Sequence, residues 1–115
     1  MDYETASTDD VESVVPEEYG GMWFFREPLG CENLGLTLLE LEPGGKGKAH
    51  DHDDGQEEVY LVVDGTVTME LGDSEDTTEE VTLKSGEAIR VGPATRRQLH
   101  NRSDERVRLA IAGAP

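Results

Sequence analysis

The chain has 115 residues, enough for one compact domain and too few for two cores. Its 26 acidic residues against 10 basic ones give a net charge of -16, which would repel nucleic-acid phosphate and anionic lipid, so we expect neither a nucleic acid nor a membrane as a partner. This excess of carboxylates favours a halophilic protein over an acidic mesophilic one, because concentrated salt screens the self-repulsion. Thirteen glycines and a low apolar content favour short strands and turns over long helices.

Residues 1–20 are acidic and carry few apolar side chains, so we predict a flexible N-terminal arm there and one barrel domain over 21–115. The arm has neither the basic start nor the apolar centre of a signal peptide, and no segment approaches the roughly 18 apolar residues of a membrane span. Cys31 is the single cysteine, so no disulfide can form within the chain. We expect a cytoplasmic protein.

Trp23, Phe24 and Phe25 carry half of the six aromatic side chains and follow the arm directly. Such a cluster must cover apolar surface. We expect it on the outer wall of the barrel or at a dimer seam rather than against a cofactor.

From residue 22 onward, short apolar runs alternate with turn residues. The runs cover 33–42, 58–63, 66–71, 80–83, 88–91 and 106–113. Apolar side chains alternate with others over 67–71 and 107–111, the period of a half-buried strand, and no segment sustains a helical period. Asp64-Gly65 stands between two runs and predicts a hairpin turn. The pattern predicts an antiparallel all-β fold, a sandwich or a barrel.

Two histidines precede the run at 58–63. In an extended chain, side chains two residues apart share a face, so His50 and His52 point the same way, as do Glu58 and Tyr60. Two imidazoles and one carboxylate can hold Fe, Mn, Zn or Cu and leave coordination positions open for water or substrate. Tyr60 is either a pocket wall that offers its hydroxyl group or a core aromatic. A histidine pair alone is more often solvated surface than a metal site, and the spacing to Glu58 and Gly65 strengthens the metal interpretation.

At this point the residues resemble those of the cupin superfamily. Its first motif runs glycine, five residues, His-x-His, three or four residues, glutamate, six residues, glycine. Gly44, His50, His52, Glu58 and Gly65 follow that pattern, except that five residues separate His52 from Glu58. An extra loop residue is easily absorbed before a strand.

Glu57 is the alternative carboxylate, because it restores a gap of four residues after His52. It would face away from Tyr60, however, so we prefer Glu58 as the ligand.

The second cupin motif runs glycine, five residues, proline, x, glycine, two residues, histidine, three residues, asparagine. Gly86 and Asn101 fit its ends, but Gly92 replaces the proline, Ala94 the glycine and Arg97 the histidine. The fourth ligand of the family is therefore missing. His100 would need a β-bulge to substitute for it, since alternation puts His100 on the face opposite Arg97; we favour a local surface or interface role for His100.

Arg97 places a permanent cation where the family has a metal ligand. Either its side chain turns toward the barrel mouth and leaves a site of three ligands, or it pairs with Glu58 in a metal-free pocket. In both cases its planar fork suits the carboxylate of a small ligand. A third interpretation is an arginine that reaches solvent or neutralises a neighbour such as Asp51.

The resemblance implies an all-β, double-stranded β-helix (jelly-roll) barrel whose interior holds a metal or small ligand. It implies a divalent transition metal (Fe, Mn, Ni, Cu or Zn) at His50, His52 and Glu58. From the residues themselves, we expect Arg97 and Tyr60 to bind a small anionic molecule. Dioxygenases, isomerases and decarboxylases occur among cupins, so the reaction stays open. The alternatives are a non-catalytic module that binds a ligand in a metal-free pocket and a purely structural jelly roll. We also expect a homodimer, because pairing would close exposed sheet edges.

Overall fold

The computed structural model of the chain describes the backbone of residues 1–51, 55–74 and 77–115, and the side chains of these residues apart from 73, 74 and 77. Two helical turns and eight strands are described. They are η1 (Glu17–Tyr19), β1 (Gly20–Phe24), α1 (Arg26–Leu29), β2 (Gly35–Leu41), β3 (Glu57–Asp64), β4 (Thr66–Ser74), β5 (Thr77–Lys84), β6 (Ala88–Val91), β7 (Arg96–His100) and β8 (Val107–Ala114).

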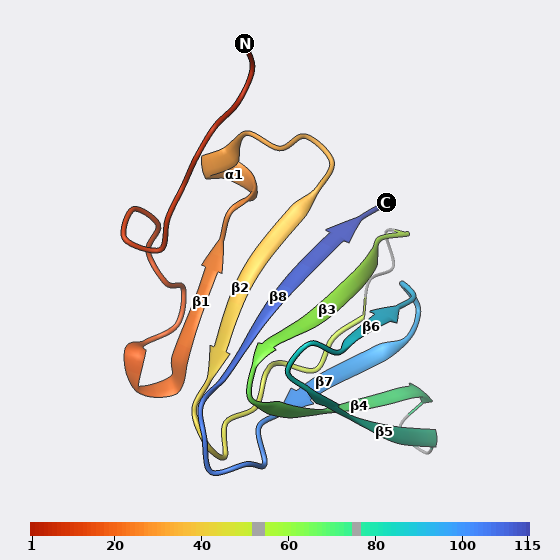
Figure 1. The fold of residues 1–115 in the computed structure, drawn as a ribbon. Coiled ribbons are helices and arrows are strands. Elements are labelled where there is room, and N and C mark those ends of the chain that lie inside the picture. Colours follow the sequence, from red (N-terminus) through yellow and green to blue (C-terminus); the bar gives the residue numbers. More distant parts are fainter. Residues whose placement is uncertain (52–54, 75–76) are drawn as a thin grey trace.

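The strands form two antiparallel sheets that face each other (Figure 1). One has the order β1-β2-β8-β3-β6 and the other the order β5-β4-β7. Strands that are neighbours in a sheet are mostly distant in sequence, as in a jelly roll. The predicted all-β jelly-roll barrel is therefore confirmed.

Alternation of apolar side chains places the core between the sheets. Val67 and Met69 of β4 are buried, as are Val107 and Leu109 of β8, so the period read from the sequence is confirmed. The opposite face of β3 is solvent-exposed and apolar, with Val59, Leu61 and Val63 between 40% and 50% exposed. The expected homodimer stays a prediction, with this face and a sheet edge as its two candidate interfaces.

The predicted hairpin at Asp64-Gly65 is wrong. β3 and β4 flank Gly65 but lie in different sheets, and β4 pairs with β5 instead. Gly65 has a φ of +97°, and a Cβ atom there would come within 3.1 Å of the Arg106 carbonyl oxygen. Glycine is thus required at a corner where the chain crosses from one sheet to the other.

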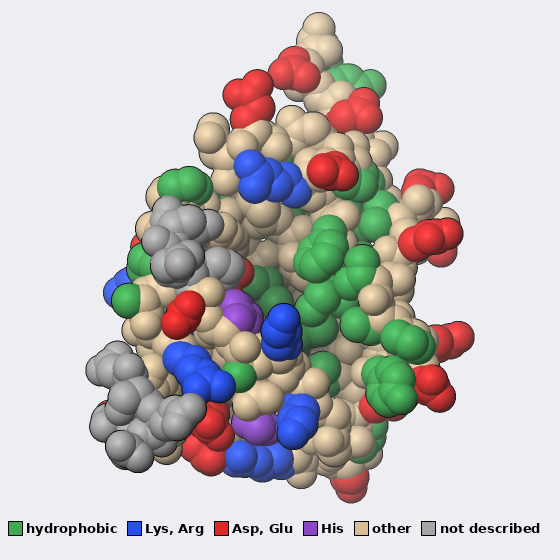
Figure 2. Space-filling view, turned by 180° about the vertical axis from the view of Figure 1, so that it is seen from behind, with side chains coloured by type: hydrophobic (Ala, Val, Ile, Leu, Met, Phe, Trp, Pro, Cys, Tyr) green, Lys and Arg blue, Asp and Glu red, His purple; other side chains and the backbone are tan. Residues whose placement is uncertain are grey.

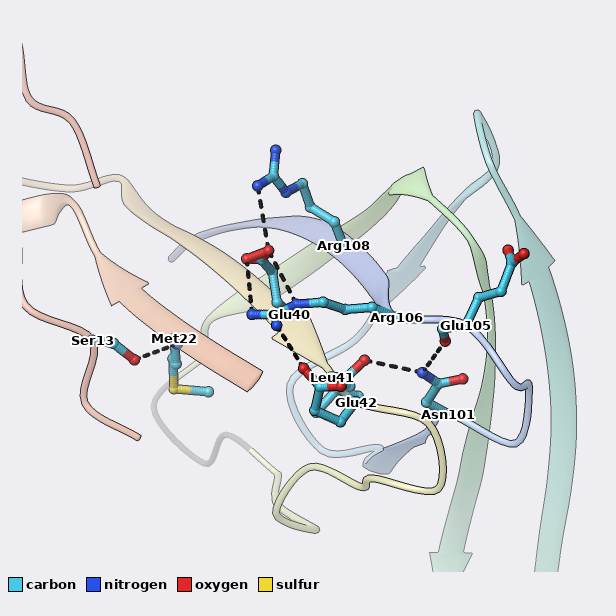
Figure 3. A network of polar contacts seen from close by, with 9 residues as sticks. All are labelled: Ser13, Met22, Glu40, Leu41, Glu42, Asn101, Glu105, Arg106 and Arg108. Carbon is cyan, nitrogen blue, oxygen red and sulfur yellow. Dashed lines mark hydrogen bonds and ion pairs between the residues drawn. The ribbon is translucent and has the colours of Figure 1, made fainter. Parts of the chain in front are cut away.

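A polar network ties the loop 101–106 to β2 (Figure 3). The buried Asn101 amide donates to the carbonyl oxygens of Leu41, at 3.0 Å, and Glu105, at 2.7 Å. Nearby, the half-exposed guanidinium groups of Arg106 and Arg108 lie 3.4 and 3.3 Å from Glu40 Oε1. The asparagine of the second motif therefore anchors the loop between β7 and β8, which fixes the position of both strands.

The N-terminal segment contacts β1. The Ser13 hydroxyl oxygen accepts a 3.0 Å hydrogen bond from the backbone N–H of Met22, and the Val14 N–H donates to the Met22 carbonyl oxygen at 2.8 Å. The first strand starts at Gly20, next to the predicted domain boundary. Among the described residues, no helix has the length and apolar character needed to cross a bilayer.

Candidate functional site

A cavity of about 270 Å³ opens between the two sheets. Figure 2 shows the hollow from outside, with hydrophobic side chains gathered on one side and histidine and basic side chains on the other. Its lining comes from both sheets and from the segment before β3. The lining residues are Met22, Phe24, Thr37, Leu39, Gly47, Lys48, His50, Glu58, Tyr60, Arg97, Leu99 and Ile111.

Three side chains converge on one carboxylate oxygen at the polar end of this cavity. The Tyr60 hydroxyl donates to Glu58 Oε1 at 2.6 Å. His50 Nε2 lies 3.4 Å from the same oxygen, and Arg97 Nη1 lies 3.6 Å from it. The third distance is that of an ion pair and is too long for a hydrogen bond.

Strand alternation explains this convergence. Glu58 and Tyr60 lie on the inner face of β3, whereas Glu57 lies on the exposed face, where its carboxylate is 4.0 Å from Arg90. Arg97 points inward from β7 in the opposite sheet, with its side chain 1% exposed. Of the two candidate carboxylates, only Glu58 lines the cavity.

His50 reaches the cavity because its segment pairs with the free edge of β7. The His50 N–H donates to the Arg97 carbonyl oxygen at 3.0 Å, and the Arg97 N–H donates to the His50 carbonyl oxygen at 2.9 Å. Closer to Gly44, the Gly47 N–H donates to the Leu99 carbonyl oxygen. The glycine-rich stretch before His50 therefore serves as a further strand-like edge of the smaller sheet.

The Lys48 carbonyl oxygen fixes the orientation of the His50 ring. Its Nδ1 lies 3.0 Å from the Lys48 carbonyl oxygen, which can only accept, so Nδ1 carries a proton and Nε2 faces Glu58. The hydrogen bond to Glu58 raises the pKa of His50 above its ordinary value, partly opposed by burial of the ring. Burial raises the pKa of the Tyr60 hydroxyl, and the hydrogen bond to Glu58 raises it further.

Arg97 is only partly satisfied by the residues that the structure describes. Its Nη2 donates to the Gly92 carbonyl oxygen at 2.6 Å. Its Nε and Nη1 are buried and have no hydrogen-bond acceptor in the described part of the chain. Because an unsatisfied buried donor costs about 1–3 kcal/mol or more when charged, these two groups mark a place for an acceptor from a ligand or from water.

The donor atoms fit a metal ion in part. The 3.4 Å between His50 Nε2 and Glu58 Oε1 suits two atoms that each lie roughly 2 Å from one ion, and the Lys48 carbonyl supplies the second contact that orients ligating histidines. His52, the third predicted ligand, lies outside the described residues. Within the described ranges, no group of three metal-binding side chains is assembled. The three-ligand assignment thus stays a prediction.

Two residues outside the predicted metal-ligand set have different surroundings. His100 is not part of the cavity lining: its Nε2 lies 3.5 Å from Glu70 Oε2 on the other face of β7 and has no hydrogen-bond partner among the described residues, so its expected surface or interface role stays a prediction. Tyr60 combines both of its expected roles, since its side chain is buried and its hydroxyl contacts Glu58 in the cavity.

The outer wall expected for Phe24 is wrong, whereas the dimer seam stays a prediction. β1 pairs with β2, which directs Met22 and Phe24 to the inner face of the larger sheet, and both side chains line the cavity. Trp23 points the other way, and its ring lies over Gly21. A run of three aromatic residues shows no apolar alternation, so its inward face could not be identified before the partner strand was known.

Comparison with known proteins identifies the family. Residues 37–112 match the family described as Cupin domain, so the chain belongs to the cupins. No curated protein matches the sequence.

Solved structures show the same fold at low sequence identity. Oxalate decarboxylase from Lactobacillus farciminis in complex with formate superposes with a TM-score of 0.80 at 17% identity, over 93% of this chain and 32% of that one. A sugar phosphate isomerase of the cupin superfamily from Silicibacter pomeroyi gives 0.75 at 20%, over 96% and 75%. Oxalate decarboxylase from Bacillus subtilis, studied for its Mn(II) centres, gives 0.76 at 18%, over 90% and 27%. This chain spans less than a third of either decarboxylase.

Proposed function

We propose that this cupin binds a small anionic molecule at Arg97, beside a divalent metal ion held by His50, His52 and Glu58. The observation that carries the proposal is the buried Arg97 guanidinium: Arg97 lines the cavity, and its Nε and Nη1 atoms have no hydrogen-bond acceptor among the described residues. A buried cation needs an anionic or hydrogen-bonding partner, and an arginine fork suits a carboxylate or phosphate.

The similar structures support a small anion and a metal as the chemistry of this cavity. One is a decarboxylase of oxalate with formate bound, and another acts on sugar phosphates, so both names refer to small anions. The Bacillus subtilis enzyme has Mn(II) centres. At these identities the likeness shows the fold alone. For this chain, the proposal of an anionic ligand therefore rests on Arg97, and the proposal of a metal rests on the His50–Glu58 pair.

Each side chain has a distinct role in the proposed site. His50 and Glu58 supply one nitrogen and one oxygen ligand, with Lys48 orienting the imidazole ring through its carbonyl oxygen. Tyr60 holds the Glu58 carboxylate in place by its 2.6 Å hydrogen bond. Arg97 orients the anion toward the positions that three protein ligands leave open. A bound metal would act as a Lewis acid on that anion.

A metal-free pocket is the second candidate, and one observation favours it. Arg97 Nη1 lies 3.6 Å from Glu58 Oε1, and the pKa of His50 is raised by the same carboxylate. In that case Glu58 neutralises two cationic side chains without a metal, and the chain is a binding module rather than a metalloenzyme.

Metal analysis combined with anion titration separates the candidates. We expect near-stoichiometric transition metal in the purified protein, lost in His50→Ala, and calorimetric binding of formate or oxalate that is lost in Arg97→Met. The matched control is Arg96→Met, because Arg96 is the exposed neighbour of Arg97 on the same strand. Anion binding without metal supports the second candidate. If the protein binds neither a metal nor an anion, both candidates are contradicted and a structural jelly roll remains.

A further inference from the structure

The cavity is chemically divided along its length. Its charged side chains, among them His50, Glu58 and Arg97, contact one another at one end. The remaining wall is mostly apolar, formed by Met22, Phe24, Leu39, Leu99 and Ile111. A fully polar anion such as oxalate would leave this apolar wall in contact with water.

Strand register gives the apolar wall its direction. Phe24 of β1 pairs with Thr37 of β2, which pairs with Ile111 of β8, which pairs with Tyr60 of β3. These four residues form one row across four neighbouring strands, with Tyr60 at the polar end and Phe24 at the sheet edge. Because strands lie about 4.8 Å apart, the row is about 14 Å long. The wall can therefore accompany an extended ligand away from Arg97.

A second cavity, of about 550 Å³, adjoins the first at the far end of this row. Phe24 and Thr37 line both cavities. The N-terminal segment contributes Val11 and Val14 to the second one. The Val14 N–H is bonded to the Met22 carbonyl oxygen, so this segment is tied to the same strand that carries Phe24. Glu12, Arg26 and Glu27 also line this second cavity, so apolar and charged side chains both lie past Phe24.

From this arrangement we infer that the ligand is a monoanionic carboxylate with an apolar chain or ring, its carboxylate at Arg97 and its apolar part along the Ile111–Thr37–Phe24 row. The inference rests on the proposed anion site and adds the chemical class of its ligand. Since the main cavity is about 270 Å³, near the lower limit of about 300 Å³ for small-molecule pockets, the ligand is small.

A series of straight-chain carboxylates tests the apolar half of the inference without any mutation. Binding of acetate, butyrate, hexanoate and octanoate to the full chain is measured by calorimetry at constant ionic strength and pH. Burial of each methylene group should strengthen binding by about fourfold until the row is filled. Hexylamine, which has the chain of hexanoate with the opposite charge, should not bind, because its ammonium group would meet the Arg97 guanidinium.

A charge placed at the apolar end of the cavity tests where the apolar part of the ligand lies. Phe24 is 50% exposed, so Phe24→Asp leaves the new carboxylate access to water and the fold intact. We expect the gain in affinity from acetate to hexanoate to be lost in this variant. The matched control is Val59→Asp, because Val59 is 40% exposed on a strand face outside the cavity; it should keep the full gain.

The outcomes distinguish the two levels of the proposal. Equal affinities from acetate to octanoate, or a gain that survives Phe24→Asp, would overturn the assignment of an apolar ligand and leave the anion site at Arg97 standing. If neither the wild type nor Arg97→Met binds any of the carboxylates, both the anion site at Arg97 and the apolar ligand class are overturned.

Discussion

Replacing Arg97 by histidine should strengthen metal binding. Arg97 Nη1 lies 3.6 Å from Glu58 Oε1, and an ion bound to that oxygen at roughly 2 Å has the guanidinium within roughly 6 Å. At about 5 Å a divalent ion and a unit charge repel each other by on the order of 7 kcal/mol at an effective dielectric constant of about 20, and by about 4 kcal/mol at about 8 Å. With its side chain buried, Arg97 gains little relief from solvent.

Arg97→His removes this repulsion and supplies the imidazole that the second cupin motif has at this position. Part of the repulsion is relieved in the wild type by movement of the side chain, so we expect a gain of at least tenfold in affinity, about 1.4 kcal/mol. The assay is competition for Mn²⁺ or Zn²⁺ against a coloured chelator. Arg97→Met separates loss of charge from gain of a ligand, and Arg96→His is the control that should leave affinity unchanged, since Arg96 is exposed.

The variant loses the hydrogen bond to the Gly92 carbonyl oxygen, so its melting temperature is measured first without metal. A folded Arg97→His protein that binds metal no more tightly than the wild type would refute the placement of Arg97 beside the ion. Weaker binding in the folded variant would mean that the guanidinium supports the site through an anion instead.

Three further results are expected. Glu58→Gln should weaken metal binding by tenfold or more and Glu57→Gln hardly at all, since only the former lines the cavity; equal effects in chelator competition would show that the inner face of β3 is not the ligand face. In metal-free protein, the pKa of His50 measured by NMR should lie above 6.5 and should fall in Glu58→Gln. The contact with Glu58 stabilises the fold fully below pH 6.5, and this contribution is lost as the pH rises through the pKa of the folded state. A His50 pKa that is unchanged in Glu58→Gln would exclude the His50–Glu58 pair. Gly65→Ala should lower the free energy of unfolding by about 1–3 kcal/mol, and by more than Gly86→Ala, because both have positive φ but only a Cβ at position 65 meets backbone; equal losses in denaturant titration would remove the steric argument.

The sequence predicted the faces of strands better than their partners. Alternation puts Glu58 and Tyr60 on one face of their strand and puts Arg97 and His100 on opposite faces of theirs, because period two is a local property. The Asp64-Gly65 pair predicts a hairpin, although the chain crosses from one sheet to the other there. A glycine with positive φ reverses the chain in both cases, so the turn residue alone cannot identify the pairing.

The apolar half of the site could not be predicted from local pattern. Phe24 enters the cavity only because β1 adds to the edge of β2, a pairing between segments that the sequence does not specify. The direction of the Arg97 side chain was also open, since a long flexible chain can reach solvent or the cavity from the same strand position. Its bond to the Gly92 carbonyl oxygen, five residues earlier, holds it inside.

The central claim is that His50, Glu58 and Arg97 form one site for a metal and an anion. Crystals grown with Mn²⁺ and hexanoate, measured at an X-ray energy where manganese scatters anomalously, test it most directly. The account predicts an anomalous peak roughly 2 Å from His50 Nε2 and from a Glu58 oxygen, with the carboxylate of hexanoate against Arg97. An empty cavity in which Arg97 and Glu58 are paired, with manganese bound only to surface carboxylates, would contradict it.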